Sequence, residues 1–512
     1  MRIAIAADHA GLPLRPVVAD AVTAAGHEPV LLGPDDGNPV DYPVVARVVA
    51  DALASGRAER GILVCGSGAG VTVAANKLPG VRAAYGADHY TAHQMVEHDA
   101  CNVMTLGGRV MGPTVAGDIV TAYVNARFSG EERHARRLAE VLQIEQERNM
   151  NPATSLHEAG QSLWLDNITR ELLDGGRLAR YVADGSITGL TSNPTIFDKA
   201  ISGSEAYSDQ IRSLAGQGLD DEEIFFELAL DDLRRAAGLF RATWDATGGR
   251  DGWVSLEVSP RLAHDTGKTV AQARDLHAKA GVPNLFIKVP GTPEGLPAIE
   301  ELIAAGIPVN VTLLFSDEQY LASAGAYQRG LRRRRDAGQS LDVASVASLF
   351  VSRWDHSTID RLPDELKDQL GVAVAKRAYR GYRATLASAA WKDLAAAGAR
   401  PQRLLFASTG TKDPALPDTF YVQELAAPDT INTMPQGTLD AFIDHGKVGE
   451  LLQPDGGDAD ELVARVEAFG VDVPELAAKL QADGASAFVD SWEDLAKTIA
   501  AKRAKLGAEA KR

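Results

Sequence analysis

The chain has 512 residues, of which 45% are apolar and 24% are charged, and its formal net charge is −17. At about 100 to 200 residues per domain, this length predicts two to four domains. The acidic balance disfavours a nucleic acid partner, because phosphate backbones are bound by lysine and arginine. We expect no membrane segment and a cytoplasmic location, because no run of about 18 residues is apolar and the N-terminus turns acidic at Asp8. The two cysteines, Cys65 and Cys101, fit a reducing compartment and are too few for a disulfide framework.

The first part of the chain, residues 1–149, alternates short β-branched runs with amphipathic stretches. This pattern predicts a doubly wound, Rossmann-like parallel sheet with helices on both faces. The expected strands are Ile3–Ala7, Pro29–Leu32, Gly61–Cys65, Val81–Tyr85 and Val103–Leu106. A glycine-rich turn, Cys65-Gly-Ser-Gly-Ala-Gly70, follows the third strand and precedes a helical stretch. Such a turn is the position at which these folds bind phosphates or oxyanions.

A polar, proline-containing segment then marks a linker at 150–155, and we expect a second domain at 156–512. Eight apolar strand candidates separated by helical stretches predict a (β/α)8 (TIM) barrel in this domain. They are Leu163–Asp166, Thr188–Ser192, Val254–Val258, Leu285–Val289, Pro308–Leu314, Val343–Val351, Arg403–Ala407 and Thr430–Met434. In a barrel the carboxyl ends of the strands meet at one mouth. The polar residues expected there are Asp166, Asn193, Glu257, Lys288, Thr312, Ser348, Arg353 and Ser408.

The glycine-rich turn suggests one chemistry for the first domain. Isomerising an aldose phosphate needs a base that moves a proton between adjacent carbons, donors for the enediolate oxygen and a group that opens the sugar ring. Cys65 begins the turn, where backbone N–H groups and a helix N-terminus favour a thiolate, and the amides of Gly66 to Gly70 can hold an anion. The alternative interpretation is an inert buried cysteine.

Several short motifs occur together in residues 1–149. They are Asp8-His9-Ala-Gly11, Asp41-Tyr-Pro43, Cys65-Gly-Ser-Gly68, Ala75-Asn-Lys77, His98, Gly107-Gly-Arg109 and Arg133-His134. As a set they resemble type B ribose-5-phosphate isomerase. The resemblance implies that Cys65 is the base, that Ser67 and the loop amides stabilise the enediolate, and that His98 with Asp8 assists ring opening. The remaining substrate-binding positions that it implies are His9, Gly66, Gly68, Gly70, Asp99, Arg109, Arg133, His134 and Arg137.

The same resemblance implies a homodimer or larger oligomer, because the family's site is shared between subunits. Two positions depart from the family pattern. Ser67 stands where many relatives have Thr, and Asp99 follows His98 where Asn is common. The first change keeps the hydroxyl group, whereas the second adds a charge near the sugar. Some relatives isomerise hexose phosphates, so pentose specificity is an expectation.

One lysine suggests a chemistry for the second domain. Lys288 lies in the apolar strand Leu285-Phe-Ile-Lys-Val-Pro290, where an ammonium is costly and needs a partner. A desolvated lysine attacks a carbonyl as the free amine. Schiff-base chemistry further needs acid and base groups, for which Glu257 and Asp166 occupy suitable strand ends. The alternative interpretation is a structural ion pair between Lys288 and Glu257.

Longer motifs cover about residues 155–505. They are Trp164-Leu-Asp-Asn-Ile168, Gly189-Leu-Thr-Ser-Asn-Pro-Thr-Ile-Phe197, Leu256-Glu-Val258, Ile287-Lys-Val-Pro290, Asn310-Val-Thr-Leu-Leu-Phe-Ser316, Ser348-Leu-Phe-Val-Ser-Arg353 and Asn432-Thr-Met-Pro435. Together they resemble transaldolase. The resemblance implies that Lys288 forms a Schiff base with a ketose phosphate, that Asp166 takes the C4 hydroxyl proton, and that Glu257 acts through a water held with Thr312. It also implies a substrate-binding set of Asn193, Ser348 and Arg353, to which we add Ser408 and Lys412 as phosphate ligands after the seventh strand.

The two resemblances together predict a bifunctional enzyme of the pentose phosphate pathway. It would act on small sugar phosphates, with no metal, no organic cofactor, no nucleic acid and no membrane as partner. Two alternatives stay open. The barrel could be a class I aldolase that hydrolyses its dihydroxyacetone enamine, or one half could be a non-catalytic scaffold or sensor.

Overall fold

The computed structural model describes residues 1–35, 38–149 and 151–509 of the chain. The chain divides into two compact units, Met1–Met150 and Asn151–Arg512, and each is described by itself. Within the described ranges, no helix is both long enough and apolar enough to cross a membrane.

The first unit is built on a parallel five-stranded sheet. Its strands are β1 (Arg2–Ala7), β2 (Glu28–Leu32), β3 (Arg60–Cys65), β4 (Ala83–Tyr85) and β5 (Val103–Gly107). The spatial order is β2-β1-β3-β5-β4, so the direction of winding changes between β1 and β3. In doubly wound folds, ligands bind in the crevice outside the carboxyl ends of the strands at such a switch point. The predicted fold class of this half is confirmed.

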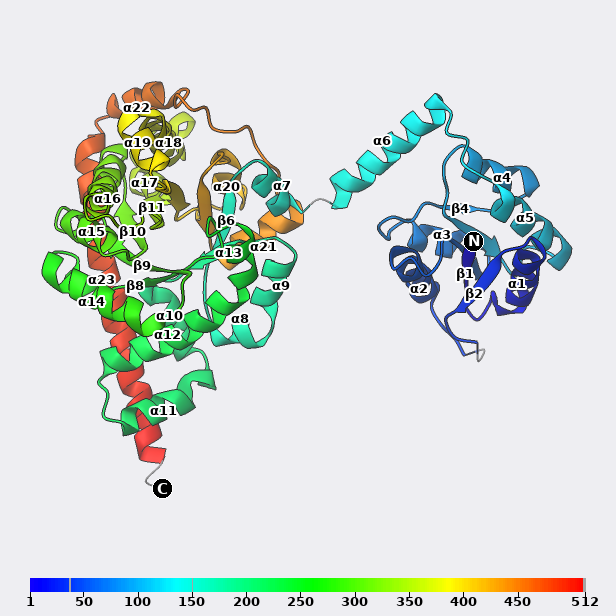
Figure 1. The fold of residues 1–512 in the computed structure, drawn as a ribbon, viewed down its shortest axis with the longest axis horizontal. Coiled ribbons are helices and arrows are strands. Elements are labelled where there is room, and N and C mark those ends of the chain that lie inside the picture. The colour runs from blue at the N-terminus through cyan, green and yellow to red at the C-terminus, as the bar shows by residue number, and fades with distance from the viewer. Residues whose placement is uncertain (36–37, 150, 510–512) are drawn as a thin grey trace. The chain divides into compact units, whose positions relative to one another are not determined.

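Helices cover both faces of this sheet (Figure 1). They are α1 (Arg15–Ala24), α2 (Tyr42–Ala54), α3 (Ala69–Ala75), α4 (His89–Glu97) and α5 (Pro113–Asn125), with a 3-10 turn at Leu12–Leu14; the last helix of the unit, α6 (Glu132–Asn149), extends away from the sheet. Alternate strand residues enter separate cores, because successive side chains of a strand point to opposite faces. Ile3 and Ile5 pack with α1, α4 and α5, whereas Ala4 and Ala6 pack with α2 and α3. Cys65 belongs to the second of these cores.

The second unit is a parallel eight-stranded barrel, as the sequence predicted. Its strands are β6 (Ser162–Asp166), β7 (Gly189–Thr191), β8 (Val254–Glu257), β9 (Leu285–Pro290), β10 (Val309–Leu314), β11 (Ser345–Phe350), β12 (Gln402–Ala407) and β13 (Ile431–Met434). The ladder runs β7-β6-β13-β12-β11-β10-β9-β8, and a bridge between Gly189 and Trp253 joins its two ends. Gly189 is required at this seam, because a Cβ there would meet the Trp164 ring at 2.7 Å.

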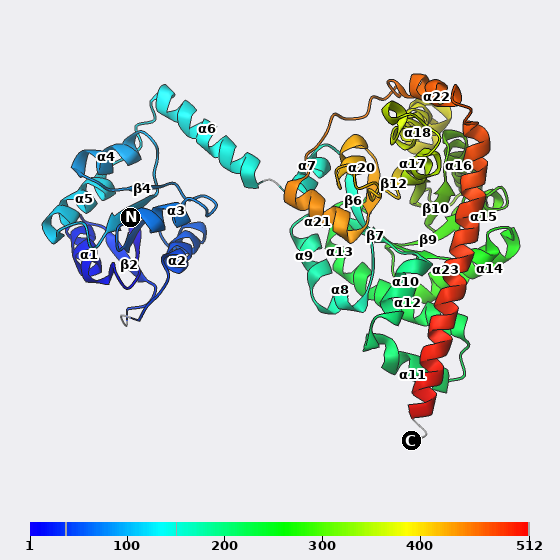
Figure 2. The ribbon, with the colours of Figure 1, turned by 180° about the vertical axis from the view of Figure 1, so that it is seen from behind.

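Helices surround the barrel, and several extend beyond the basic β/α pattern (Figures 1 and 2). They are α7 (Pro152–Glu158), α8 (Arg170–Asp174), α9 (Arg177–Ala183), α10 (Pro194–Ser202), α11 (Ser208–Gly216), α12 (Asp221–Leu239), α13 (Arg241–Ala246), α14 (Thr266–Ala280), α15 (Gly295–Ala304), α16 (Asp317–Asp336), α17 (Ser352–Thr358), α18 (Leu370–Ala387), α19 (Ala389–Ala396), α20 (Phe420–Glu424), α21 (Gln436–His445), α22 (Ala459–Glu467) and α23 (Val473–Glu509), with 3-10 turns at Glu205–Tyr207, Pro260–Leu262 and Asp364–Leu366. Helix α7 begins inside the segment that the sequence assigned to a linker. The Asn151 side chain caps it, and Ala153 is buried in the barrel core.

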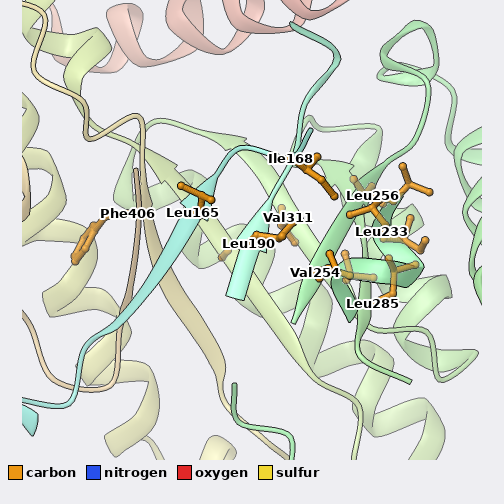
Figure 3. Packing of buried hydrophobic residues seen from close by; sticks show 14 of the residues in the cluster. Leu165, Ile168, Leu190, Leu233, Val254, Leu256, Leu285, Val311 and Phe406 are labelled. Atoms are coloured by element: carbon orange, nitrogen blue, oxygen red, sulfur yellow. The ribbon is translucent and has the colours of Figure 1, made fainter. Parts of the chain in front are cut away.

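Period-two alternation sorts the barrel residues into an outer and an inner set. Leu165, Leu190, Val254 and Leu256 pack outward against the helices, and Figure 3 shows the last two close to Leu233 of α12. The aromatic side chains of Trp164, Trp253 and Phe286 belong to a separate inner cluster. These three rings fill the interior toward the end at which the strands begin, whereas the opposite end combines polar side chains with a few apolar ones such as Phe350.

A buried ion pair holds the amino-terminal end of the barrel together. Asp251 and Arg403 approach to 3.2 Å, and their side chains are only 9% and 7% exposed. Asp251 also accepts hydrogen bonds from Ser162, Trp164 and Thr188. One carboxylate thus ties together the start of β6, the segment before β7 and the start of β12.

Asp251→Ala leaves the Arg403 charge buried without its carboxylate, so we expect the free energy of unfolding of the barrel to fall by about 3 to 5 kcal/mol. Urea unfolding followed by tryptophan fluorescence measures this change, because all six tryptophans lie in the barrel unit. Asp209→Ala is the control, since Asp209 pairs with Arg212 at the surface and its loss costs less than about 1 kcal/mol. Equal effects of the two changes would contradict the assigned role of Asp251.

Candidate active sites

The side chain of Lys288 points into the barrel because alternate residues of β9 face inward. Leu285 and Ile287 belong to the outer core, whereas Phe286 belongs to the inner cluster. Lys288 lies two residues after Phe286 and therefore faces the same side of the strand, so its side chain enters the barrel near the carboxyl end of β9. The lysine is 5% exposed. An ammonium so deeply placed needs a compensating charge.

That charge comes from the neighbouring strand. The parallel register places Glu257 of β8 opposite Lys288, and its Oε2 atom lies 3.3 Å from Lys288 Nζ. The glutamate is also 5% exposed. Burial raises the pKa of Glu257, and the Lys288 charge opposes that rise. The carboxyl group can therefore carry a proton at pH values at which an exposed glutamate is ionised.

A second carboxyl group lies at the end of β6. Asp166 lines the same cavity as Lys288, and the register places it opposite Thr191, whose hydroxyl donates to Asp166 Oδ1 at 2.8 Å. Burial raises the pKa of Asp166, whereas the Lys288 charge and the Thr191 hydrogen bond lower it. The two carboxyl groups around Lys288 thus have different partners, which suits them to different proton transfers.

Polar side chains of β10 and β11 complete the wall beside Lys288. Ser348 donates to Asn310 Oδ1 at 2.8 Å. Thr312 is fully buried, and among the described residues its Oγ1 makes no hydrogen bond, nor does Oε1 of Glu257. Since buried polar atoms are normally hydrogen-bonded, these two oxygens are suited to a water molecule or a substrate hydroxyl.

The far end of the cavity carries positive charge. The cavity has a volume of about 340 Å³, and Arg353, Ser408 and Lys412 line it together with Lys288 and Asp166. Burial lowers the pKa of Arg353, and partial desolvation and the Arg353 charge lower that of Lys412. In the part of the chain that the structure describes, neither cation forms an ion pair. Two unpaired cations beside a hydroxyl are suited to a phosphate.

Several residues that line this cavity were not predicted as site residues from the sequence, and three of them carry a charge or an aromatic ring. Lys199 of α10 adds a third cation, Phe350 lies at the end of β11, and Phe488 comes from α23. The Phe488 ring centroid lies 5.5 Å from Lys288 Nζ. Phe350 lies within the motif Ser348–Arg353. Lys199 and Phe488 lie in helices, where no motif or spacing distinguishes a site residue from an ordinary lysine or aromatic residue. Asn193, by contrast, was expected here and both lines the cavity and caps α10.

The first unit has a cavity of about 410 Å³ at the switch point between β1 and β3. Its lining includes seven of the residues that the sequence singled out, namely Asp8, His9, Cys65, Gly66, Ser67, Gly70 and Arg109. Asp8 uses one carboxylate oxygen to accept the N–H groups of Ala10 and Gly11, at 2.9 Å each. The carboxylate is therefore held rigidly beside the thiol-bearing strand.

The glycine-rich turn shapes the surroundings of Cys65. The backbone nitrogen of Gly68 lies 3.2 Å from Cys65 Sγ and donates its N–H to the sulfur. Gly68 has φ +85°, and a Cβ there would meet the Tyr85 ring at 2.3 Å. Only glycine satisfies both demands, so this position is fixed by geometry.

The other histidine and arginine residues predicted for this site lie elsewhere in the unit. Within one chain the lining of the Cys65 cavity does not include the following residues: His98, Asp99, Arg133, His134 and Arg137. The rings of His98 and His134 stack at 4.1 Å, and Ser129 contacts His134 Nδ1 at 2.7 Å. Arg133 pairs with Glu131 at 3.0 Å, and Arg137 is exposed. The predicted residues thus form two separate groups in a single chain.

Comparison with known proteins identifies the barrel. Residues 163–499 match the model of the transaldolase/fructose-6-phosphate aldolase family. The chain belongs to this family. The transaldolase of Frankia alni is 47% identical over 368 residues, which cover 70% of this chain and 99% of that protein. The transaldolase of Thermobifida fusca is 46% identical, over 68% of this chain and 98% of the relative.

The first unit matches a different family. Residues 3–141 match the ribose/galactose isomerase model. A solved structure of type B ribose 5-phosphate isomerase from Trypanosoma brucei is 45% identical and covers 28% of this chain and 97% of that chain, with a TM-score of 0.28. Both families predicted from the motifs are confirmed. The chain combines them in a bifunctional enzyme of the pentose phosphate pathway.

Proposed function

We propose that the barrel transfers a dihydroxyacetone unit from fructose 6-phosphate or sedoheptulose 7-phosphate to an aldose phosphate. The observation that carries this proposal is the buried pair of Lys288 and Glu257, 3.3 Å apart at the carboxyl end of the strands. A lysine buried beside a carboxyl group of raised pKa can pass its proton on and attack a carbonyl as the free amine.

The first step forms a covalent imine. The amine of Lys288 attacks C2 of the ketose, and the resulting carbinolamine loses water to give an iminium ion. Glu257 moves the protons through a water held with Thr312, the residue whose buried hydroxyl has no hydrogen-bond partner among the described residues. Asn193 and Ser348, which line the cavity, bind the hydroxyl groups of the dihydroxyacetone part.

The second step breaks and remakes a carbon–carbon bond. Asp166 accepts the C4 hydroxyl proton while the C3–C4 bond breaks, and the electron pair of that bond enters the iminium to form an enamine. The aldose phosphate leaves, and C3 of the enamine attacks the aldehyde of the acceptor. Hydrolysis of the new imine frees Lys288 and the product ketose. Arg353, Ser408 and Lys412 bind the phosphate in both half-reactions.

For the first unit we propose the isomerisation of ribose 5-phosphate to ribulose 5-phosphate. Cys65 as thiolate takes the C2 proton and returns it to C1 through an enediolate. Ser67 and the amides of Gly66, Gly68 and Gly70 stabilise the enediolate oxygen. Asp8 and His98 assist ring opening.

We further propose that this site is completed in a homodimer. His98 and His134 lie outside the Cys65 cavity of their own chain, so His98 of the partner subunit would reach the sugar. The partner subunit's Arg133 and Arg137 would then bind the phosphate with His9 and Arg109, and the partner's His134 and Asp99 would support them. We place both reactions in the cytoplasm, where charged sugar phosphates are retained.

Single substitutions separate the two proposed activities. We expect Cys65→Ser to lower ribose 5-phosphate isomerisation by at least about 100-fold, because the general base is lost, and to leave aldol transfer unchanged. Lys288→Met should abolish transfer and leave isomerisation unchanged. Isomerisation is measured with ribose 5-phosphate on each full-length variant, and transfer with fructose 6-phosphate, with and without erythrose 4-phosphate. Isomerisation that survives in Cys65→Ser would overturn the base assignment, and release of dihydroxyacetone without acceptor would identify a hydrolysing aldolase.

The pH dependence of transfer tests the role of Asp166. As the base, Asp166 must be ionised, so the rate falls as the pH drops through its raised pKa. Thr191→Val removes a hydrogen bond that stabilises the carboxylate, so the pKa rises further and the acidic limb of kcat/KM moves to higher pH. Thr385→Val is the control, because among the described residues that hydroxyl bonds only within α18. If Thr191→Val does not shift the acidic limb of kcat/KM, Asp166 is not the base.

A further inference from the structure

Helix α23 contributes one face to the transaldolase site. Gln481, Gly484 and Phe488 are spaced by three and four residues, so they lie on the same side of the helix. Phe488 lines the cavity. A Cβ at Gly484 would lie 3.3 Å from Arg353 Nη1. This 37-residue helix runs along the barrel unit in both ribbon views (Figures 1 and 2).

Gln481 joins this helix to two strand ends. Its Nε2 donates to the carbonyl oxygen of Leu313 at 2.8 Å and to that of Gly291 at 3.1 Å. Leu313 directly follows Thr312 in β10, and Gly291 directly follows β9, the strand that carries Lys288. One side-chain amide therefore binds the two backbone segments that carry Lys288 and Thr312.

The backbone that Gln481 binds is strained. Leu313 is 1% exposed and has φ +60°, a left-handed conformation that costs a branched residue about 1 to 3 kcal/mol. The pairing of β10 with β11 shifts register between Val311 and Leu314, so Thr312 lies inside a bulge. Bulges of this kind redirect a side chain next to an active site. Such a backbone persists only where its surroundings hold it.

Two hydrogen bonds hold consecutive carbonyl groups of the bulge. The N–H of Gly291 donates to Thr312 O at 2.7 Å, and Gln481 binds Leu313 O. A Cβ at Gly291 would meet Leu314 Cδ2 at 2.4 Å, so a larger residue at this contact would displace the Leu314 side chain. Without the amide of Gln481, the Leu313 carbonyl loses the side-chain donor that faces it, and the strained peptide can relax toward a regular strand.

We propose that Gln481 is a positioning residue for Thr312 in imine formation and hydrolysis. The inference rests on the proposed transaldolase function. Gln481 acts by fixing the bulge that aims the Thr312 hydroxyl toward the water shared with Glu257. Phosphate binding by Arg353 does not depend on this contact, so the effect falls on turnover rather than on substrate affinity.

Gln481→Met tests the proposal, because it keeps the length of the side chain and removes its donors. We expect kcat for transfer from fructose 6-phosphate to fall on the order of tenfold, with KM changed by less than about threefold. The rate at which a borohydride-reducible adduct forms on the enzyme should fall by the same factor. Lys479→Met is the matched control, since it places the same side chain on the exposed face of α23 and should leave all three quantities unchanged.

A double-mutant cycle separates positioning from general stability. If Gln481 acts through Thr312, the Gln481→Met/Thr312→Ala variant should be no slower than Thr312→Ala alone. Additive losses, or an unchanged kcat in Gln481→Met, would overturn the proposal. Tryptophan fluorescence checks the fold of each variant, and Gln481→Glu replaces Gln481→Met if the latter unfolds. If the wild-type enzyme has no transfer activity, both the proposed function and this inference are wrong. If the wild type is active but the losses in the two single variants add in the double variant, only the inference is wrong.

Discussion

A buried ammonium and the carboxyl group beside it set the requirements for the barrel site. Lys288 and Glu257 are each 5% exposed and lie 3.3 Å apart, so removing either deprives the other buried group of its ion-pair partner. The parallel register of β8 and β9 pairs them directly. The remaining polar groups then have defined places around the lysine: Asp166 at the end of β6, Thr312 in the bulge of β10, and the cations that we propose to bind phosphate after β11 and β12.

The two units solve a similar chemical problem with different folds. In both, the side chain that we propose to react lies at the carboxyl end of a parallel strand, where the following loop brings further donors to it. Cys65 depends on backbone N–H groups of a glycine-rich turn, such as that of Gly68. Lys288 depends on side chains from neighbouring strands. The difference follows from topology, because an open sheet offers one switch point, whereas a closed barrel directs eight strand ends into one mouth.

Strand positions, and the polar residues at their ends, could be predicted because they follow from local periodicity and from βα alternation. Asp166, Lys288 and Ser348 were therefore predictable from the sequence alone. Phe488, Lys199 and Gln481 were not, because each occupies a helix whose path over the barrel is set by packing between residues far apart in sequence. The sequence also could not show that His98 lies outside the Cys65 cavity of its own chain, because the spacing of motifs along a sequence does not give their distance in space.

The central claim is that Lys288 forms a Schiff base with a ketose phosphate. Borohydride reduction in the presence of fructose 6-phosphate, followed by peptide mass spectrometry, tests it directly, because reduction converts the imine into a stable secondary amine. We predict one dihydroxyacetone adduct per chain, located on the peptide that contains Lys288 and absent from Lys288→Met. No adduct in folded protein, or an adduct on a different lysine such as Lys199, would contradict this claim.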